Sequence, residues 1–117
     1  MEATEKYEII IAFVGKVAPN KVYVDLVWNL AIREEFKSSG IYINAIIDER
    51  SLACVDCSES ETCFFVVAVR NPAQTQFEED YYNALGRIMF KVRDELNNPY
   101  MFVMSEKINA SYFPQAE

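Results

Sequence analysis

The chain has 117 residues, 51% of them apolar, so it is long enough to bury the core of one ordinary domain without staples. Its 11 basic and 18 acidic residues give a net charge of −7, which repels nucleic-acid phosphates and argues against a nucleic-acid partner. No apolar run reaches the ~20 residues that cross a bilayer, and glutamates precede the first apolar run where a signal peptide needs positive charge, so we expect a soluble, cytoplasmic protein without a membrane partner.

Six elements are predicted from the apolar pattern, with β-branched and aromatic runs taken as strands and apolar residues at helical spacing taken as helices. In chain order they are a strand at 7–14, a helix from 19–20 to about 38, strands at 41–48 and 62–69, a helix from 75–78 to 97–99, and a strand at 100–104. Gly40 suits the left-handed cap that ends a helix. Thr75 and Glu78 have the spacing of a capping box at the start of the second helix.

The predicted fold class is an α/β (α+β) two-layer sandwich in the order β-α-β-β-α-β, with a four-stranded sheet and two helices on one face. We expect one domain over residues 1–117, with flexible ends at 1–6 and 114–117.

The first helix is more apolar than one sheet face requires. Tyr23, Val27 and Leu30 form one stripe, while Trp28, Ile32 and Phe36 repeat on another side of the helix. Trp28 either packs beneath a loop or belongs to a subunit contact, where aromatic residues are enriched. The surplus predicts a homo-oligomer, with interface candidates Trp28, Ile32, Phe36 and, on the second helix, Phe90.

All three cysteines, Cys54, Cys57 and Cys63, lie within twelve residues. One C-x-x-C without any histidine is a weak zinc signal, because a structural zinc site needs four strong ligands. The acidic run that follows Cys57 disfavours a reactive redox pair, since nearby carboxylates raise a thiol pKa. We expect three free thiols on a β-hairpin, with Cys57 at the exposed tip, and no bound cofactor.

No other pattern carries chemistry by itself, so no catalytic residue is predicted. Histidine is absent, and acid–base work near neutral pH would need a carboxylate, a lysine or the chain terminus. The run FVGKVAPNK (13–21) has one glycine and one lysine, but it lacks the spacing of a phosphate loop.

The segment SESETCFFVVAV (58–69) resembles the macrophage migration inhibitory factor branch of the tautomerase superfamily, with YYNALGRIMFKV and PYMFVMSEKINAS at the places of its second helix and last strand. The resemblance implies a trimer with pockets between subunits, where Tyr100 would match a pocket tyrosine. It also implies tautomerisation by an N-terminal proline. This chain begins Met1-Glu2-Ala3 and has no proline before Pro19, so we expect the fold without tautomerase activity.

Three functional hypotheses follow. The leading one is a non-catalytic, oligomeric α/β binding protein, a divergent member of the tautomerase fold. The alternative is an acidic, monomeric ferredoxin-like module of the inhibitor or immunity type, which binds a protein partner through its charge. The third is a small-molecule enzyme that uses a carboxylate without a recognisable motif.

Overall fold

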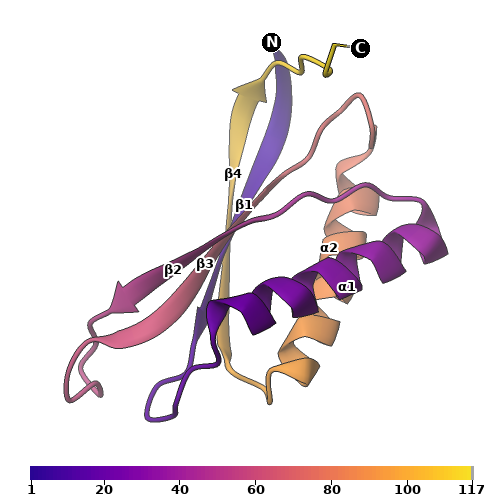
Figure 1. Cartoon of the computed structure of the whole chain (residues 1–117). Coiled ribbons are helices and arrows are strands. Elements are labelled where there is room, and N and C mark those ends of the chain that lie inside the picture. The colour runs from indigo at the N-terminus through magenta and orange to yellow at the C-terminus, as the bar shows by residue number, and fades with distance from the viewer. Residues whose placement is uncertain (117) are drawn as a thin grey trace.

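The computed structural model describes residues 1–116. Its elements are β1 (Glu2–Ala12), α1 (Lys21–Ser39), β2 (Ile46–Leu52), β3 (Glu61–Val69), α2 (Glu78–Glu95) and β4 (Tyr100–Ala110) (Figure 1). The strands form one antiparallel sheet in the order β2-β3-β1-β4. This is a ferredoxin-like α+β fold, so the predicted fold class is confirmed.

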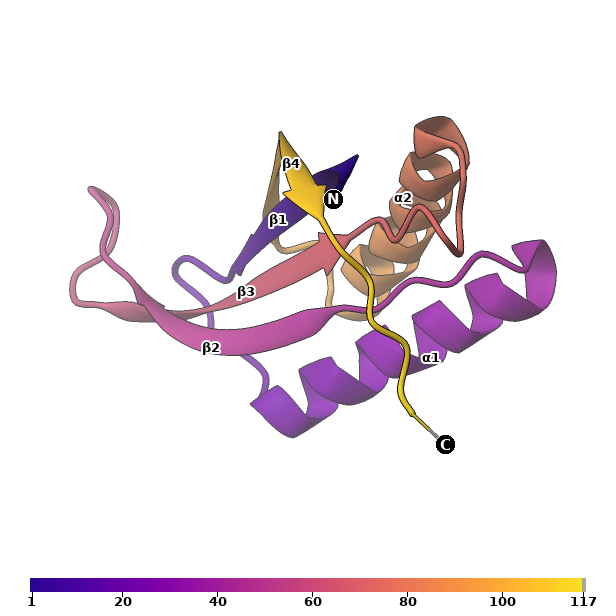
Figure 2. The same ribbon diagram turned by 90° about the horizontal axis from the view of Figure 1, so that it is seen from above.

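Both helices cover the same side of the sheet (Figure 2). Tyr7, Ile9 and Ile11 of β1 alternate toward the helices and are at most 2% exposed. The opposite side, here called the open sheet face, carries an apolar centre that no element of the described chain covers. Its apolar residues, which share one face by the strand register, are Ile10, Phe65, Val67, Phe102 and Met104, and Glu8 lies among them between Val67 and Met104.

Strand β1 begins five residues earlier than predicted, because residues 2–6, expected to be loose, pair with the end of β4. The apolar pattern stops at these polar residues, but their side chains have partners far away in the sequence. The Thr4 hydroxyl donates to the Arg70 carbonyl at 2.6 Å, and the Glu5 carboxylate pairs with the Arg70 guanidinium. The second flexible end was predicted at 114–117. Residues 114–116 form no helix or strand, and residue 117 lies outside the described residues.

Other strand boundaries differ from the prediction as well, since β1 ends at Ala12 instead of 14 and β2 ends at Leu52 instead of 48. Strand β2 begins at Ile46, because residues 41–45 pack against the core without pairing, with Ile43 only 4% exposed. Strand β4 continues to Ala110, six residues beyond its predicted end. Its polar half pairs with the polar start of β1, which an apolar pattern cannot reveal.

Helix α1 follows the prediction closely. The Asn20 side chain accepts a hydrogen bond from the Tyr23 N–H at 3.2 Å, and Gly40 ends the helix in the left-handed region with φ 75°. The capping box predicted for α2 is wrong. That helix begins at Glu78 after Phe77, and the buried Thr75 hydroxyl has no hydrogen-bond partner among the described residues.

The interface candidates lie in different environments. Trp28 is fully buried in the core of its own chain, so it has no surface for a second subunit. Ile32 is partly buried against the same core, and Phe36 packs on Tyr42 with ring centroids 4.6 Å apart. Phe90 is 78% exposed on α2, and its role in an interface stays a prediction.

Candidate functional site

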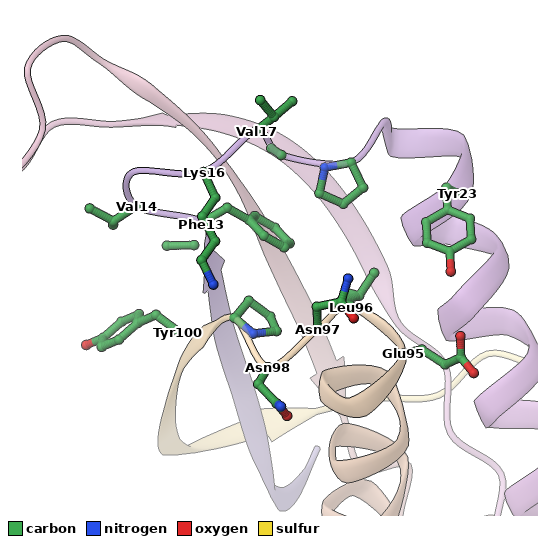
Figure 3. Close-up of a pocket in the computed structure, with 14 residues that line it drawn as sticks. Phe13, Val14, Lys16, Val17, Tyr23, Glu95, Leu96, Asn97, Asn98 and Tyr100 are labelled. Carbon is green, nitrogen blue, oxygen red and sulfur yellow. The ribbon is translucent and has the colours of Figure 1, made fainter.

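A cleft of about 440 Å³ opens at one end of the sheet, where β1 ends and β4 begins (Figure 3). Its size is within the range of about 300–1,000 Å³ that is usual for small-molecule sites. Two loops form most of the wall, the β1–α1 connection at 13–20 and the α2–β4 connection at 96–99. Phe13 and Leu96 are nearly buried and give the cleft an apolar base.

The loops have defined conformations that follow from their sequences. Gly15 has φ 74°, and its N–H donates to both carboxylate oxygens of Glu61 at 3.2 Å, which ties the first loop to the start of β3. Asn97 and Asn98 both have positive φ, a conformation that asparagine tolerates. The Arg93 side chain donates to the Pro99 carbonyl at 3.2 Å and holds the second loop against α2.

The polar groups of the cleft come from distant parts of the chain. Lys16 and Glu95 are its charged residues among those described, and neither has an ion-pair partner there. Tyr23 and Tyr100 add aromatic rings that are 43% and 60% exposed. An apolar base, two aromatic rings and two uncommitted charges of opposite sign suit a ligand that is part aromatic and part zwitterionic.

A second cleft of about 450 Å³ lies at the other end of the sheet, beside Arg70. The Arg70 guanidinium already donates four hydrogen bonds within the chain, to both Glu5 oxygens at 2.6 and 3.1 Å and to the carbonyls of Thr75 and Gln76 at 3.0 Å. These contacts give Arg70 a structural role, and the first cleft is the better candidate for a functional site.

Three side chains in and around this network have shifted pKa values. The hydrogen bonds from Arg70 lower the pKa of Glu5. Burial raises the pKa of Tyr7 to about 12 and also raises that of Tyr81. Shifted pKa values often mark functional sites, but ion pairs that only stabilise a fold produce them as well.

The structure corrects the interpretation of the cysteines. Cys54 and Cys57 form a disulfide at the tip of the β2–β3 hairpin, where three free thiols were predicted. A turn in which the Cys57 N–H donates to the Cys54 carbonyl brings the two Cα atoms to 5.1 Å, within the usual range for a disulfide. Cys63 is free and buried, and burial raises its thiol pKa.

With Cys54 and Cys57 bonded to each other, their sulfurs are not free to act as metal ligands in this structure. No group of three or more histidine, cysteine, aspartate or glutamate side chains placed to hold a metal occurs in residues 1–116. Over the same residues, neither helix is both long enough and apolar enough to span a membrane.

Tyr100, the predicted pocket residue, lies at the rim of the first cleft. Its contact with a ligand stays a prediction. The other lining residues that matter here, Lys16, Tyr23 and Glu95, were not identified from the sequence. The one local signal was Lys16 beside Gly15 after the first strand. The residues around this pair lack the spacing of a phosphate loop, so the signal was set aside.

Comparisons with known proteins identify relatives of the chain. Residues 2–114 match the family described as SAM lyase. A phage SAM lyase in complex with S-methyl-5′-thioadenosine has a TM-score of 0.57 at 12% identity, over 95% of this chain and 93% of that one. Phage SAM lyase in the apo state gives 0.53 at 11% identity, over 96% and 94%. No curated protein sequence matches the chain significantly.

The designed protein Foldit4 is similar in structure to the same degree, with a TM-score of 0.55 at 15% identity, over 90% of this chain and 97% of that one. A designed protein and a phage enzyme thus share this fold with the chain. At such identities the structural likeness shows the fold alone, and the family rests on the sequence match.

The match to the SAM lyase family overturns three interpretations of the sequence. The tautomerase resemblance is wrong, because the element order and apolar strands that carried it belong to a fold with many unrelated functions. The non-catalytic binding protein and the acidic interaction module are wrong as well, because a lyase is an enzyme. The third hypothesis, a small-molecule enzyme, is the one that agrees with the match.

Proposed function

Because the chain belongs to the SAM lyase family, we propose that it cleaves S-adenosylmethionine (SAM) and releases S-methyl-5′-thioadenosine (MTA). The family match over residues 2–114 carries the proposal, since it spans nearly the whole chain. The MTA bound to the phage relative supports the identity of the product.

The first cleft supports this substrate through its charges. Lys16 is the one cationic side chain among the described residues that line it, so the cleft lacks the cluster of positive groups that a phosphate-bearing nucleotide needs. SAM carries no phosphate and has a sulfonium cation, which the net charge of −7 attracts. The apolar base and the tyrosine rings suit the adenine portion.

The proposed reaction breaks the bond between the sulfonium sulfur and Cγ of the methionine portion. The electron pair stays on sulfur, so MTA leaves as a neutral thioether that needs no proton. A lyase consumes no water, and Cγ must therefore gain its new bond within the substrate. Either the substrate carboxylate attacks Cγ and closes a five-membered lactone, or a base removes a Cβ proton and an alkene forms.

The cleft of this chain contributes binding and exclusion of water to either route. The sulfonium loses its positive charge as the bond breaks. A poorly hydrated site over Phe13 and Leu96 therefore destabilises the charged substrate more than it destabilises the transition state, in which part of the charge is already lost. Glu95 is the one carboxylate among the described lining residues that could accept a proton on the alkene route. The lactone route needs no base from the protein.

The proposal is tested by incubating the purified protein with SAM and following both compounds by liquid chromatography with mass detection. We expect MTA to form in step with SAM loss, faster than in buffer or with heat-denatured protein. S-adenosylhomocysteine, a neutral thioether, should stay intact. The lactone and the alkene are isomers with the same mass, so the retention time of the four-carbon product against authentic standards distinguishes the two routes. SAM that decays only at the buffer rate would refute the proposed function.

We further infer that the protein is a homo-oligomer that packs through the open sheet face. The apolar centre of this face includes Phe102, which is 48% exposed, and charged pairs such as Lys6 with Glu106 border it. An exposed apolar patch bordered by charged residues is typical of a protein interface, and Glu8, which lies within this patch, would need a polar partner from the second copy. The number of copies is open, because the trimer was implied only by the overturned resemblance.

Phe102→Asp is expected to dissociate the oligomer, because it places an unpaired charge in the apolar centre of the face. Light scattering should give a multiple of the 13.5 kDa chain mass for the native protein and one chain for the variant. Val22→Asp, at an exposed apolar position of α1 on the helix side, serves as the matched control and should keep the native mass. A native protein that is monomeric across the micromolar range would contradict the inference.

A further inference from the structure

Another pocket lies beside the C-terminal half of α1, on the helix side of the sheet. After α1 the chain turns at Gly40 and runs back beside the helix toward β2 (Figures 1 and 2). A pocket of about 380 Å³, here called the α1 pocket, lies between the helix and residues 41–44. Among the described residues it shares no lining residue with the first cleft. Because it lies on the helix side, packing of copies through the open sheet face leaves it accessible.

The lining of the α1 pocket is mainly apolar. Ile32 and Phe36 come from α1, and Ile41 and Tyr42 come from the segment that follows it. The ring centroids of Phe36 and Tyr42 are 4.6 Å apart, and these two residues are still 40% and 53% exposed. A ligand with an apolar or aromatic body would cover these rings and remove them from water, which is favourable.

The charged residues of the α1 pocket are both cations. Arg33 and Lys37 line it one helical turn apart on α1, and neither has an ion-pair partner in residues 1–116. No carboxylate is among the described residues that line the pocket. Like charges at this spacing repel each other, and an anion between them offsets that repulsion. Lys37 also lies in the last turn of α1, where it offsets the partial negative charge of the helix end that would otherwise repel an anion.

We propose that the α1 pocket binds a small organic anion that has one carboxylate and an apolar, preferably aromatic, body. The planar guanidinium of Arg33 matches a carboxylate with two parallel hydrogen bonds, and the ammonium of Lys37 adds a second positive charge. The apolar body lies against Phe36 and Tyr42. The proposal does not rest on SAM cleavage, and SAM itself is a poor ligand here, because the two cations repel its sulfonium.

Phosphorylated sugars and nucleotides fit this lining less well. Beyond the two cations, its polar side-chain groups among the described residues are the Asn44 amide and the Tyr42 hydroxyl. These are few for a ligand with several hydroxyls, each of which would lose water without gaining a partner. An apolar carboxylate has one polar group, and the two cations satisfy it.

Naphthylacetate and naphthylacetamide separate the two parts of the proposal, because they share the aromatic body and only the first carries a charge. Equilibrium dialysis against the purified native protein gives the Kd of each compound. We expect the acid to bind at least about ten times more tightly than the amide, as a charged hydrogen bond contributes. Added salt should weaken binding of the acid and leave binding of the amide unchanged. MTA in excess should displace neither compound, because the first cleft is a separate site.

The double variant Arg33→Met with Lys37→Met should raise the Kd of the acid to that of the amide and leave the Kd of the amide unchanged. Arg33→Lys, which keeps the charge, should retain part of the preference for the acid. Lys21→Met removes a lysine from the other end of the same helix, and it is the matched control that should keep both Kd values. Phe36→Ala should weaken the acid and the amide by the same factor, since both cover its ring.

Four results would overturn the proposed site. These are equal Kd values for acid and amide in the native protein, a double variant that keeps the preference for the acid, displacement of the acid by MTA, or a native protein that binds neither compound at millimolar concentration. Formation of MTA from SAM is measured separately, and its absence would refute the proposed function while leaving these binding results as they are.

Discussion

Replacing Arg70 by methionine is expected to lower the free energy of unfolding by about 3–5 kcal/mol, the range found when one partner of a buried ion pair is removed. The Arg70 and Glu5 side chains are only 8% and 7% exposed. Methionine would leave the Glu5 carboxylate without its bidentate partner and two loop carbonyls without their donor. Urea unfolding at neutral pH measures the loss.

The same pair predicts how stability depends on pH. Hydrogen bonds from Arg70 hold the folded pKa of Glu5 below its ordinary value of 4.5. The stabilisation is therefore complete above pH 4.5 and is lost as the pH falls through the folded pKa of Glu5. The difference between native protein and Arg70→Met should shrink in acid.

Lys21→Met provides the control for this prediction, because it breaks an exposed pair with Asp25 one helical turn away. Such pairs contribute about 0.3–0.5 kcal/mol, so the variant should unfold almost like the native protein. If Arg70→Met and Lys21→Met lowered the free energy of unfolding by the same amount, the buried network would contribute no more to stability than an exposed ion pair.

Replacing Tyr23 by alanine is expected to raise the Kd for MTA about 10- to 100-fold. Stacking of a base on an aromatic side chain contributes about 1–3 kcal/mol by alanine substitution, and every 1.4 kcal/mol is a factor of ten. Tyr23 is 43% exposed, so its ring can be removed without opening a cavity in the core. Calorimetric titration with MTA measures the change.

The matched control is Tyr112→Ala. Tyr112 is a half-exposed tyrosine that lines the second cleft, which has nearly the same volume at the other end of the molecule. Its removal should leave MTA binding unchanged. The reverse result, with Tyr112→Ala weakening MTA and Tyr23→Ala neutral, would move the site to the second cleft.

The sequence predicted the elements whose signals are local. The Asn20 cap and the Gly40 end of α1 depend on residues within one turn of the helix, and the structure has both. Thr4 and Glu5 were not recognised as strand residues because their partner, Arg70, is 65 or more residues away. Trp28 was placed on the wrong side of α1 because apolar residues surround that helix, and only packing decides which of them face the sheet.

The candidate site was less predictable than the fold. Lys16 and Glu95 come from a loop and a helix end that are 79 positions apart, and the pairing of β1 with β4 places those two segments at the same end of the sheet. Neither residue belongs to a recognisable motif, and a single lysine or glutamate is an ordinary surface residue in most proteins. The functional hypothesis failed for a related reason, since fold-level patterns do not specify chemistry.

A crystal structure of the protein with MTA tests the central claim most directly, because it locates the product without assuming a mechanism. The account predicts MTA in the cleft between the loops at 13–20 and 96–99, with the adenine against the ring of Tyr23. MTA bound at any other surface, or a cleft that stays empty at saturating MTA, would contradict it.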